Sequence, residues 1–209
     1  MIKIWGRNTS SNVQKAMWAV GELGLEHSRI DVGGAFGKTK EPAYLAMNPN
    51  SLVPTLEEEN GFILWESNSI IRYLAGKHDK AGVLEPKDAH QRGLASQWMD
   101  WQLSVVGPAI LGAFWGLIRT PEDKRDHAAI KTSQEKTSDC MVILDKQLGK
   151  TEYVSGSTFS YGDIPVGVMC YRYVQLVSNR PATPNLDRWY AAISKRKAFH
   201  DHVGSIPLS

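Results

Sequence analysis

The feature that most restricts how this chain can fold is the valine–proline pair Val53-Pro54. A proline nitrogen carries no hydrogen and cannot donate to a β-ladder, so Pro54 is expected where a strand begins, with Val53 extended before it. If the Val53–Pro54 bond is cis, the backbone N–H and C=O of Val53 turn outward and can pair with an extended peptide. The segment therefore predicts a strand start with an open backbone edge.

A second restricting feature is Glu66-Ser67, which follows a short apolar run and precedes a helical pattern. Ser67 stands at the predicted helix start, where free N–H groups and the helix dipole attract a carboxylate. Glu66 beside it offers an anion to an ammonium group. Together with the backbone of Val53, this pair predicts a binding site for a short peptide that carries both a carboxylate and an ammonium group.

The chain changes character after its first eighty residues. Up to that point short strand patterns alternate with helical ones, and later the apolar spacing is that of long helices. The order of elements predicts an α+β, thioredoxin-like domain over 1–80, a linker over 81–88 and an all-α helical domain over 89–209. The expected strands are 2–5, 27–32, 55–58 and 62–64, with helices at 12–23, 42–47 and 67–77 between them.

Composition excludes several classes of protein. Of the 209 residues 42% are hydrophobic and 22% charged, and the net charge of +2 is too small for a nucleic-acid-binding surface. We find no run resembling a membrane span or a signal peptide and expect a cytoplasmic protein. The two cysteines, Cys140 and Cys170, lie in helical patterns without metal-ligand spacing and are expected to be buried thiols, so no metal site is predicted.

The strand start at Val53-Pro54 and the helix start at Glu66-Ser67, in this order, resemble the glutathione-binding domain of the cytosolic glutathione transferases. The resemblance covers essentially all 209 residues and is closest to the bacterial serine- or asparagine-type classes, similar to theta, phi and nu. It implies a detoxifying transferase that binds reduced glutathione as co-substrate, stabilises its thiolate and transfers it to an electrophilic, apolar second substrate.

In this family the turn between the first strand and first helix holds the group that donates to the glutathione sulfur. Counting along the turn places Ser10 on the hydroxyl position, with Asn12 as second candidate and Ser11 as third. The simpler alternative stays open, because Ser10 or Ser11 would also serve as an ordinary helix N-cap. No tyrosine or cysteine lies in the turn, which argues against the tyrosine-type and disulfide-forming classes.

The resemblance implies further contacts to glutathione from the first domain. The Val53 backbone would pair with the peptide, and Lys38 would meet the glycyl carboxylate with Thr39 as a weaker neighbour. Where several classes place a polar contact residue, this chain has Leu52. The implied glutathione-binding set is Lys38, Thr39, Val53, Pro54, Glu66 and Ser67.

The second substrate would lie against the helical domain, where aromatic and aliphatic residues recur at helical spacing. Most of these side chains must form the core, and those turned toward the first domain could line an apolar pocket. The candidates are Val106, Ile110, Phe114 and Trp115, with Arg119 at the edge.

Other functions remain compatible with the same motifs. A glutathione-dependent peroxidase, isomerase or dehalogenase would differ only in its second substrate, and a non-catalytic glutathione-binding regulatory module would keep the fold without turnover. By resemblance the protein is expected to be a homodimer that binds neither nucleic acid nor a membrane.

Overall fold

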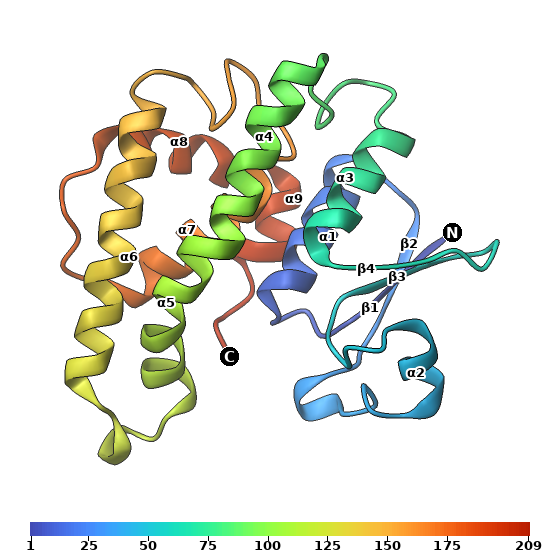
Figure 1. Cartoon of the computed structure of the whole chain (residues 1–209), viewed down its shortest axis with the longest axis horizontal. Coiled ribbons are helices and arrows are strands. Elements are labelled where there is room, and N and C mark those ends of the chain that lie inside the picture. The colour runs from blue at the N-terminus through green and yellow to red at the C-terminus, as the bar shows by residue number, and fades with distance from the viewer. The chain divides into compact units, whose positions relative to one another are not determined.

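The computed structural model describes residues 1–209, and the chain divides into two compact units. The first unit holds Met1–Glu85 together with Lys197–Ile206, and the second holds Pro86–Arg196 with Pro207–Ser209. Figure 1 shows a strand-containing part with its helices and a part built from helices alone. The predicted fold class, a thioredoxin-like part followed by a helical part, is confirmed.

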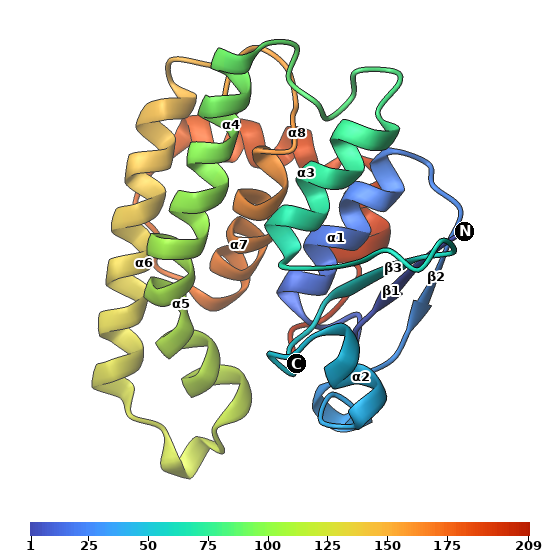
Figure 2. The ribbon, with the colours of Figure 1, turned by 45° about the vertical axis from the view of Figure 1, so that its right-hand side comes forward.

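The first unit is built on a four-stranded mixed sheet (Figure 2). The central pair is antiparallel, with Ile4 opposite Leu56, and both of these side chains are fully buried. Asn60-Gly61, a dipeptide that favours tight hairpin turns, forms the turn between the last two strands, where Gly61 has a φ of +84° and its N–H bonds the carbonyl of Glu58. Across the sheet the strands follow the order β2 (His27–Ile30), β1 (Ile2–Trp5), β3 (Thr55–Glu58) and β4 (Ile63–Trp65), with β1 and β2 parallel.

Three helices complete this unit: α1 (Ser11–Glu22), α2 (Pro42–Met47) and α3 (Ser67–His78). Helices α1 and α3 pack together on one side of the strands, and α2 lies on the other (Figure 2). The spacing of α1 predicts one apolar face, yet every residue from Val13 to Val20 is buried. A helix buried all round needs a further packing partner.

That partner is the C-terminal segment formed by α9 (Lys197–Phe199) and a π-helical turn at His200–Gly204. Phe199 meets Trp18 of α1 edge to face, with ring centroids 4.9 Å apart. A Cβ on Gly21 would lie 2.9 Å from the Cβ of Ala198, so the two helices approach as closely as a glycine allows. The domain boundary expected from sequence, 89–209, therefore differs from the structure, in which residues 197–206 belong to the first unit.

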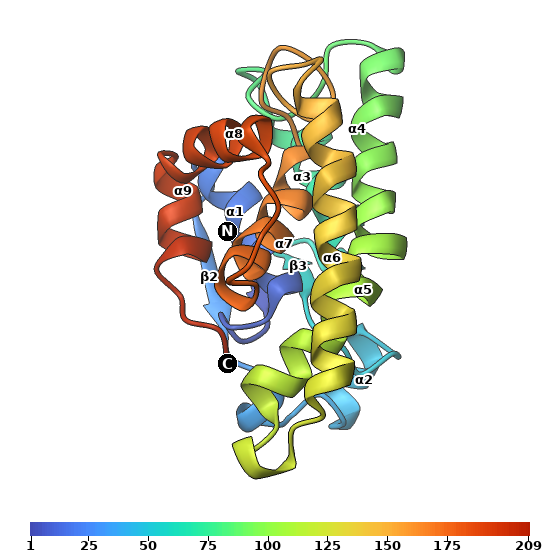
Figure 3. The same cartoon turned by 90° about the vertical axis from the view of Figure 1, so that its left-hand side faces the viewer.

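The second unit is a bundle of helices around α7 (Asp163–Leu176), which is buried over most of its length. Figure 3 shows α6 (His127–Leu148) running beside the helix formed by α4 (Ala89–Trp101) and α5 (Gly107–Phe114). A short helix, α8 (Pro184–Ser194), packs against α6 and α7. Cys140 and Cys170 are free and buried here, as predicted.

A π-helical turn over Gln102–Val106 joins α4 to α5, which begins at Gly107-Pro108, so α4 and α5 form one continuous helix. The Gly107 N–H bonds the carbonyl of Gln102, one residue farther back than in an α-helix. A second π-helical turn, Trp115–Arg119, ends it, and a single 3₁₀ turn at Glu122–Lys124 precedes α6. By length and composition alone the helix Ala89–Arg119, which contains an 18-residue window with a mean hydropathy of 1.5, could cross a membrane, but core helices of globular proteins meet the same criterion.

Candidate functional site

The strand start at Pro54 is held in place by α2. The Val53–Pro54 peptide bond is cis, and the β3 ladder begins only at Thr55. Tyr44 donates its hydroxyl to the Leu52 carbonyl at 2.6 Å, and Asn48 donates to the same oxygen at 2.9 Å. Because both residues also contact the Thr55 hydroxyl, they fix the chain on either side of Val53.

The N-terminus of α3 lies where the sequence predicts it, at Ser67. Ser67 is buried, whereas Glu66 is exposed and has a φ of +72°, a left-handed value that non-glycine residues rarely adopt. Glu66, at the N-cap position, makes no side-chain capping bond. The positive end of the helix dipole and the N–H groups of a helix start are suited to an anion.

The turn before α1 leaves its serine hydroxyl uncommitted. Ser10 occupies the N-cap position of α1, but its side chain makes no capping bond, so the alternative of a simple cap is not realised. Ser11 is the first residue of the helix. The turn is tight, since a Cβ on Gly6, whose φ is +155°, would lie 2.3 Å from Cγ2 of Val13. Ser10 is thus presented by a closely packed loop.

Asn12 connects the two helix starts. Its Oδ1 lies 3.4 Å from the Ser67 hydroxyl of α3, which brings two of the predicted site residues together. The same oxygen accepts a hydrogen bond of 3.0 Å from the ammonium of Lys15. Lys15 has no exposed surface at all, which sequence analysis missed because lysine is usually read as a solvated residue.

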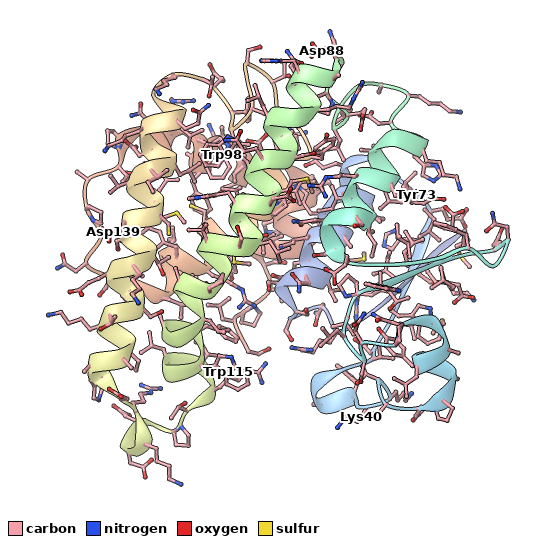
Figure 4. All side chains as sticks on the ribbon, in the orientation of Figure 1. Lys40, Tyr73, Asp88, Trp98, Trp115 and Asp139 are labelled. Carbon is pink, nitrogen blue, oxygen red and sulfur yellow. The ribbon has the colours of Figure 1, made fainter.

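Three non-glycine residues in the chain have a positive φ, and all belong to segments of the predicted site: Lys38 (+67°), Ser51 (+58°) and Glu66 (+72°). Such backbone strain clusters at functional sites. The Ser51 hydroxyl bonds the carbonyl of Thr39 at 2.9 Å, which joins the loop of Lys38 to the strand start. The Lys38 side chain is exposed, and Lys40 also points outward from this loop (Figure 4).

Arg7 is a further residue of this region that sequence analysis did not single out. A Cβ on Gly34 would lie 3.0 Å from Cδ and Nε of Arg7, so the glycines of this loop leave room for the arginine side chain. A Cβ on Gly33 would meet Val53 at 3.2 Å and Thr39 at 3.5 Å. The same Cβ would lie 3.5 Å from Nη1 of Arg7, so the guanidinium lies near Val53 and Thr39.

The residues expected to line a second-substrate pocket all lie in the second unit, where they differ in exposure. Val106, Ile110 and Phe114 are buried, and the Arg172 guanidinium covers the Phe114 ring at 4.3 Å. Trp115 is 56% exposed and projects from the end of α5 (Figure 4). Arg119 is exposed and donates to the carbonyl of Ser209. Their role toward a substrate stays a prediction.

Comparison with known proteins agrees with this geometry. Residues 9–77 match the family model "Glutathione S-transferase, N-terminal domain". The chain is 39% identical over 210 residues to glutathione S-transferase GstB of Escherichia coli K12, covering 100% of both proteins. It belongs to the glutathione S-transferase family. The solved theta-class enzyme from Xanthomonas axonopodis pv. citri with glutathione bound superposes with a TM-score of 0.94 at 42% identity, covering 100% of this chain and 99% of that one. Glutathione S-transferase D6 of Drosophila melanogaster is more distant, 26% identical over 192 residues, which are 92% of this chain and 86% of that protein.

In this glutathione S-transferase, the residues that end or begin an element can be predicted from local sequence, whereas those that hold them in place cannot. Tyr44 and Asn48 carry no local signal, since their partners at Leu52 and Thr55 become neighbours only when α2 folds back. For Lys15 a weak signal existed, because a spacing of three residues from Asn12 puts both side chains on one helix face.

Proposed function

We propose that this chain is a cytoplasmic glutathione transferase that binds reduced glutathione in its first unit and transfers the thiolate to an electrophilic, apolar second substrate. The observation that carries the proposal is the 3.4 Å approach of the Ser67 hydroxyl to Asn12. It puts a helix start suited to a carboxylate beside the turn that offers donors to a sulfur.

Each part of the tripeptide finds matching chemistry in this arrangement. The N-terminus of α3 at Ser67 would accept the γ-glutamyl carboxylate, with Glu66 beside it for the ammonium. The backbone of Val53 would pair with the cysteinyl residue of glutathione, as a strand edge pairs with an extended peptide. Lys38 and Thr39 would meet the glycyl carboxylate.

The sulfur would then lie near the turn before α1. A thiol is a poor nucleophile and its thiolate a good one, so an enzyme gains by lowering the thiol pKa. The Ser10 hydroxyl and the Asn12 amide are the two donors we assign to this anion, with the Ser11 hydroxyl as third candidate. Fixed binding of the tripeptide would add the benefit of proximity to the second substrate.

We also propose that the protein acts as a homodimer. Leu103 and Leu111, eight residues apart on the continuous helix of the second unit, share a face and are 51% and 52% exposed. Exposed apolar side chains gathered on one helix mark a surface that a partner can cover. Sedimentation equilibrium should give twice the chain mass of 23.2 kDa, and a mass equal to one chain would contradict the dimer.

The test of the function is a titration of the purified protein with reduced glutathione, followed by calorimetry, and an assay of conjugation to an activated aryl halide. Binding together with thiolate-dependent conjugation is the expected result. Binding without turnover of aryl halides, peroxides or alkyl halides would favour a non-catalytic module. No heat at millimolar glutathione would refute the proposal.

A further inference from the structure

We propose that Lys15 is a positioning residue whose buried ammonium, by donating to Oδ1 of Asn12, fixes the Asn12 amide so that its N–H group faces the glutathione sulfur. This inference rests on the proposed function and deepens it, since it assigns the setting of the thiol pKa to a residue that does not touch the substrate.

Lys15 is a fully buried lysine. It has 0% exposed surface and lies in α1 near Val13, Ala16 and Ala19, which are buried as well. An ammonium removed from water is costly unless it is hydrogen-bonded. A lysine at this place therefore demands a polar partner, and Asn12 Oδ1 supplies one at 3.0 Å.

The donor chemistry of lysine decides which end of the Asn12 amide is free. An ammonium has three donors and no acceptor, so the amide atom facing it must be the oxygen. The Ser67 hydroxyl approaches that oxygen as well, at 3.4 Å. With Oδ1 engaged by Lys15 and Ser67, Asn12 has only its Nδ2 group to offer a ligand, and Nδ2 can only donate.

A donor is what a thiolate requires. Hydrogen bonding to the charged form of an acid favours that form and lowers its pKa. The Lys15 charge strengthens the effect, because a hydrogen bond to the amide oxygen polarises the amide and makes its N–H a better donor. The positive charge of Lys15 acts in the same direction, because a nearby opposite charge favours an anion.

The matched variants are Lys15→Met, which keeps the unbranched apolar stem without the charge, and Lys15→Arg, which keeps both charge and donors. The readouts are the affinity for reduced glutathione by calorimetry and the pKa of the bound thiol from the ultraviolet absorption of the thiolate. For Lys15→Met we expect affinity within about threefold of the original. The bound thiol pKa should rise by about one unit, and kcat/KM at neutral pH should fall about tenfold with little change in KM.

Lys15→Arg should restore most of the pKa shift, which a purely structural role of the side chain would not require. A folded Lys15→Met protein whose bound thiol keeps its original pKa would overturn the proposal.

A second variant keeps the proposal open to refutation if Lys15→Met does not fold. Asn12→Asp retains an oxygen for Lys15 and for Ser67 but removes the N–H donor, so thermal stability should be kept or increased. The bound thiol pKa should rise by at least one unit, since a donor is replaced by a negative charge. An unchanged or lowered thiol pKa in this variant would overturn the assignment of Asn12 Nδ2 and with it the role of Lys15.

Different results would contradict the proposed function and the role of Lys15. If the unmodified protein binds no glutathione, the proposed function and this inference fall together, before any variant is made. If the unmodified protein binds glutathione with a lowered thiol pKa that neither Lys15→Met nor Asn12→Asp changes, only the inference falls.

Discussion

Replacing Ser10 by alanine should separate catalysis from stability, because the structure gives this N-cap serine no capping bond. A hydrogen bond to a charged group contributes about 1.5–3 kcal/mol. One pKa unit corresponds to about 1.36 kcal/mol, so loss of the Ser10 donor should raise the pKa of the bound thiol by about one to two units. At a pH below both values the thiolate fraction, and with it kcat/KM, should fall about 10- to 100-fold.

The same substitution should leave the free energy of unfolding within about 0.5 kcal/mol, since no protein–protein hydrogen bond is lost. The matched control is Asp126→Ala at the N-cap of α6, where the carboxylate accepts from the Ala129 N–H at 2.9 Å. That variant should lose about 1 kcal/mol of stability and keep the thiol pKa.

The assay combines the ultraviolet absorption of the bound thiolate between pH 5 and 9 with thermal unfolding of both variants. A Ser10→Ala protein that loses as much stability as Asp126→Ala and keeps the original thiol pKa would refute the reasoning. Ser10 would then be a cap, and the sulfur donor would have to be Asn12 or Ser11.

Three other substitutions test how the surrounding structure is held. Gly6→Ala should destabilise the first unit by about 2–4 kcal/mol in denaturant unfolding, because its Cβ would lie 2.3 Å from Val13, and Val13→Ala should recover part of that loss. Burial raises the pKa of the Asp79 carboxyl, but hydrogen bonds from backbone N–H groups of the following turn outweigh burial and hold the pKa below 3.8. The stability that this carboxylate contributes is therefore present above pH 3.8 and is lost as the pH falls through the pKa of Asp79 in the folded protein. Asp79→Ala should accordingly be about 1–2 kcal/mol less stable at pH 7, with a difference that shrinks in acid; equal stability at pH 7 would contradict this account. The Asp163 carboxylate accepts hydrogen bonds from the backbone N–H groups of Val154 and Ser160 and from the indole N–H of Trp189. In Asp163→Asn an amide NH₂ would face one of these buried donors, so the variant should lose at least about 2 kcal/mol of stability in thermal unfolding. An unchanged melting temperature would contradict this account of Asp163.

Local signals in the sequence were sufficient wherever one residue determines the backbone. Gly61 after Asn60 predicts the hairpin turn, and Ser67 after a strand predicts the start of α3, and both predictions are confirmed. At such positions the chemistry of one or two neighbouring residues decides the conformation, whatever the rest of the fold does. That is why the boundaries of α2 and β3 could also be predicted from sequence.

The C-terminal segment shows where this reasoning stops. Three apolar residues of this segment are buried at helical spacing: Ala198, Phe199 and Val203. The spacing predicts a helix with one covered face but does not indicate which part of the chain covers it. The covering surface is α1, nearly the whole chain away in sequence, and the reason lies in the close approach at Gly21 and the ring contact with Trp18. Long-range packing of this kind leaves no local trace, so the sequence predicts a helical segment here but not the helix that it packs against.

The pattern of helix caps connects the fold to the site. In the second unit α4 and α6 begin with aspartates, Asp88 and Asp126, whose carboxylates accept from the first turn. In the first unit α1 and α3 begin with Ser10 and Glu66, neither of which makes a side-chain capping bond. Uncapped helix starts leave backbone donors without a side-chain acceptor, which is unfavourable unless water or a ligand accepts from them. What distinguishes these two starts is that Asn12 joins them, and an anionic ligand with two charged groups would fit both: glutathione has a γ-glutamyl carboxylate and a thiolate.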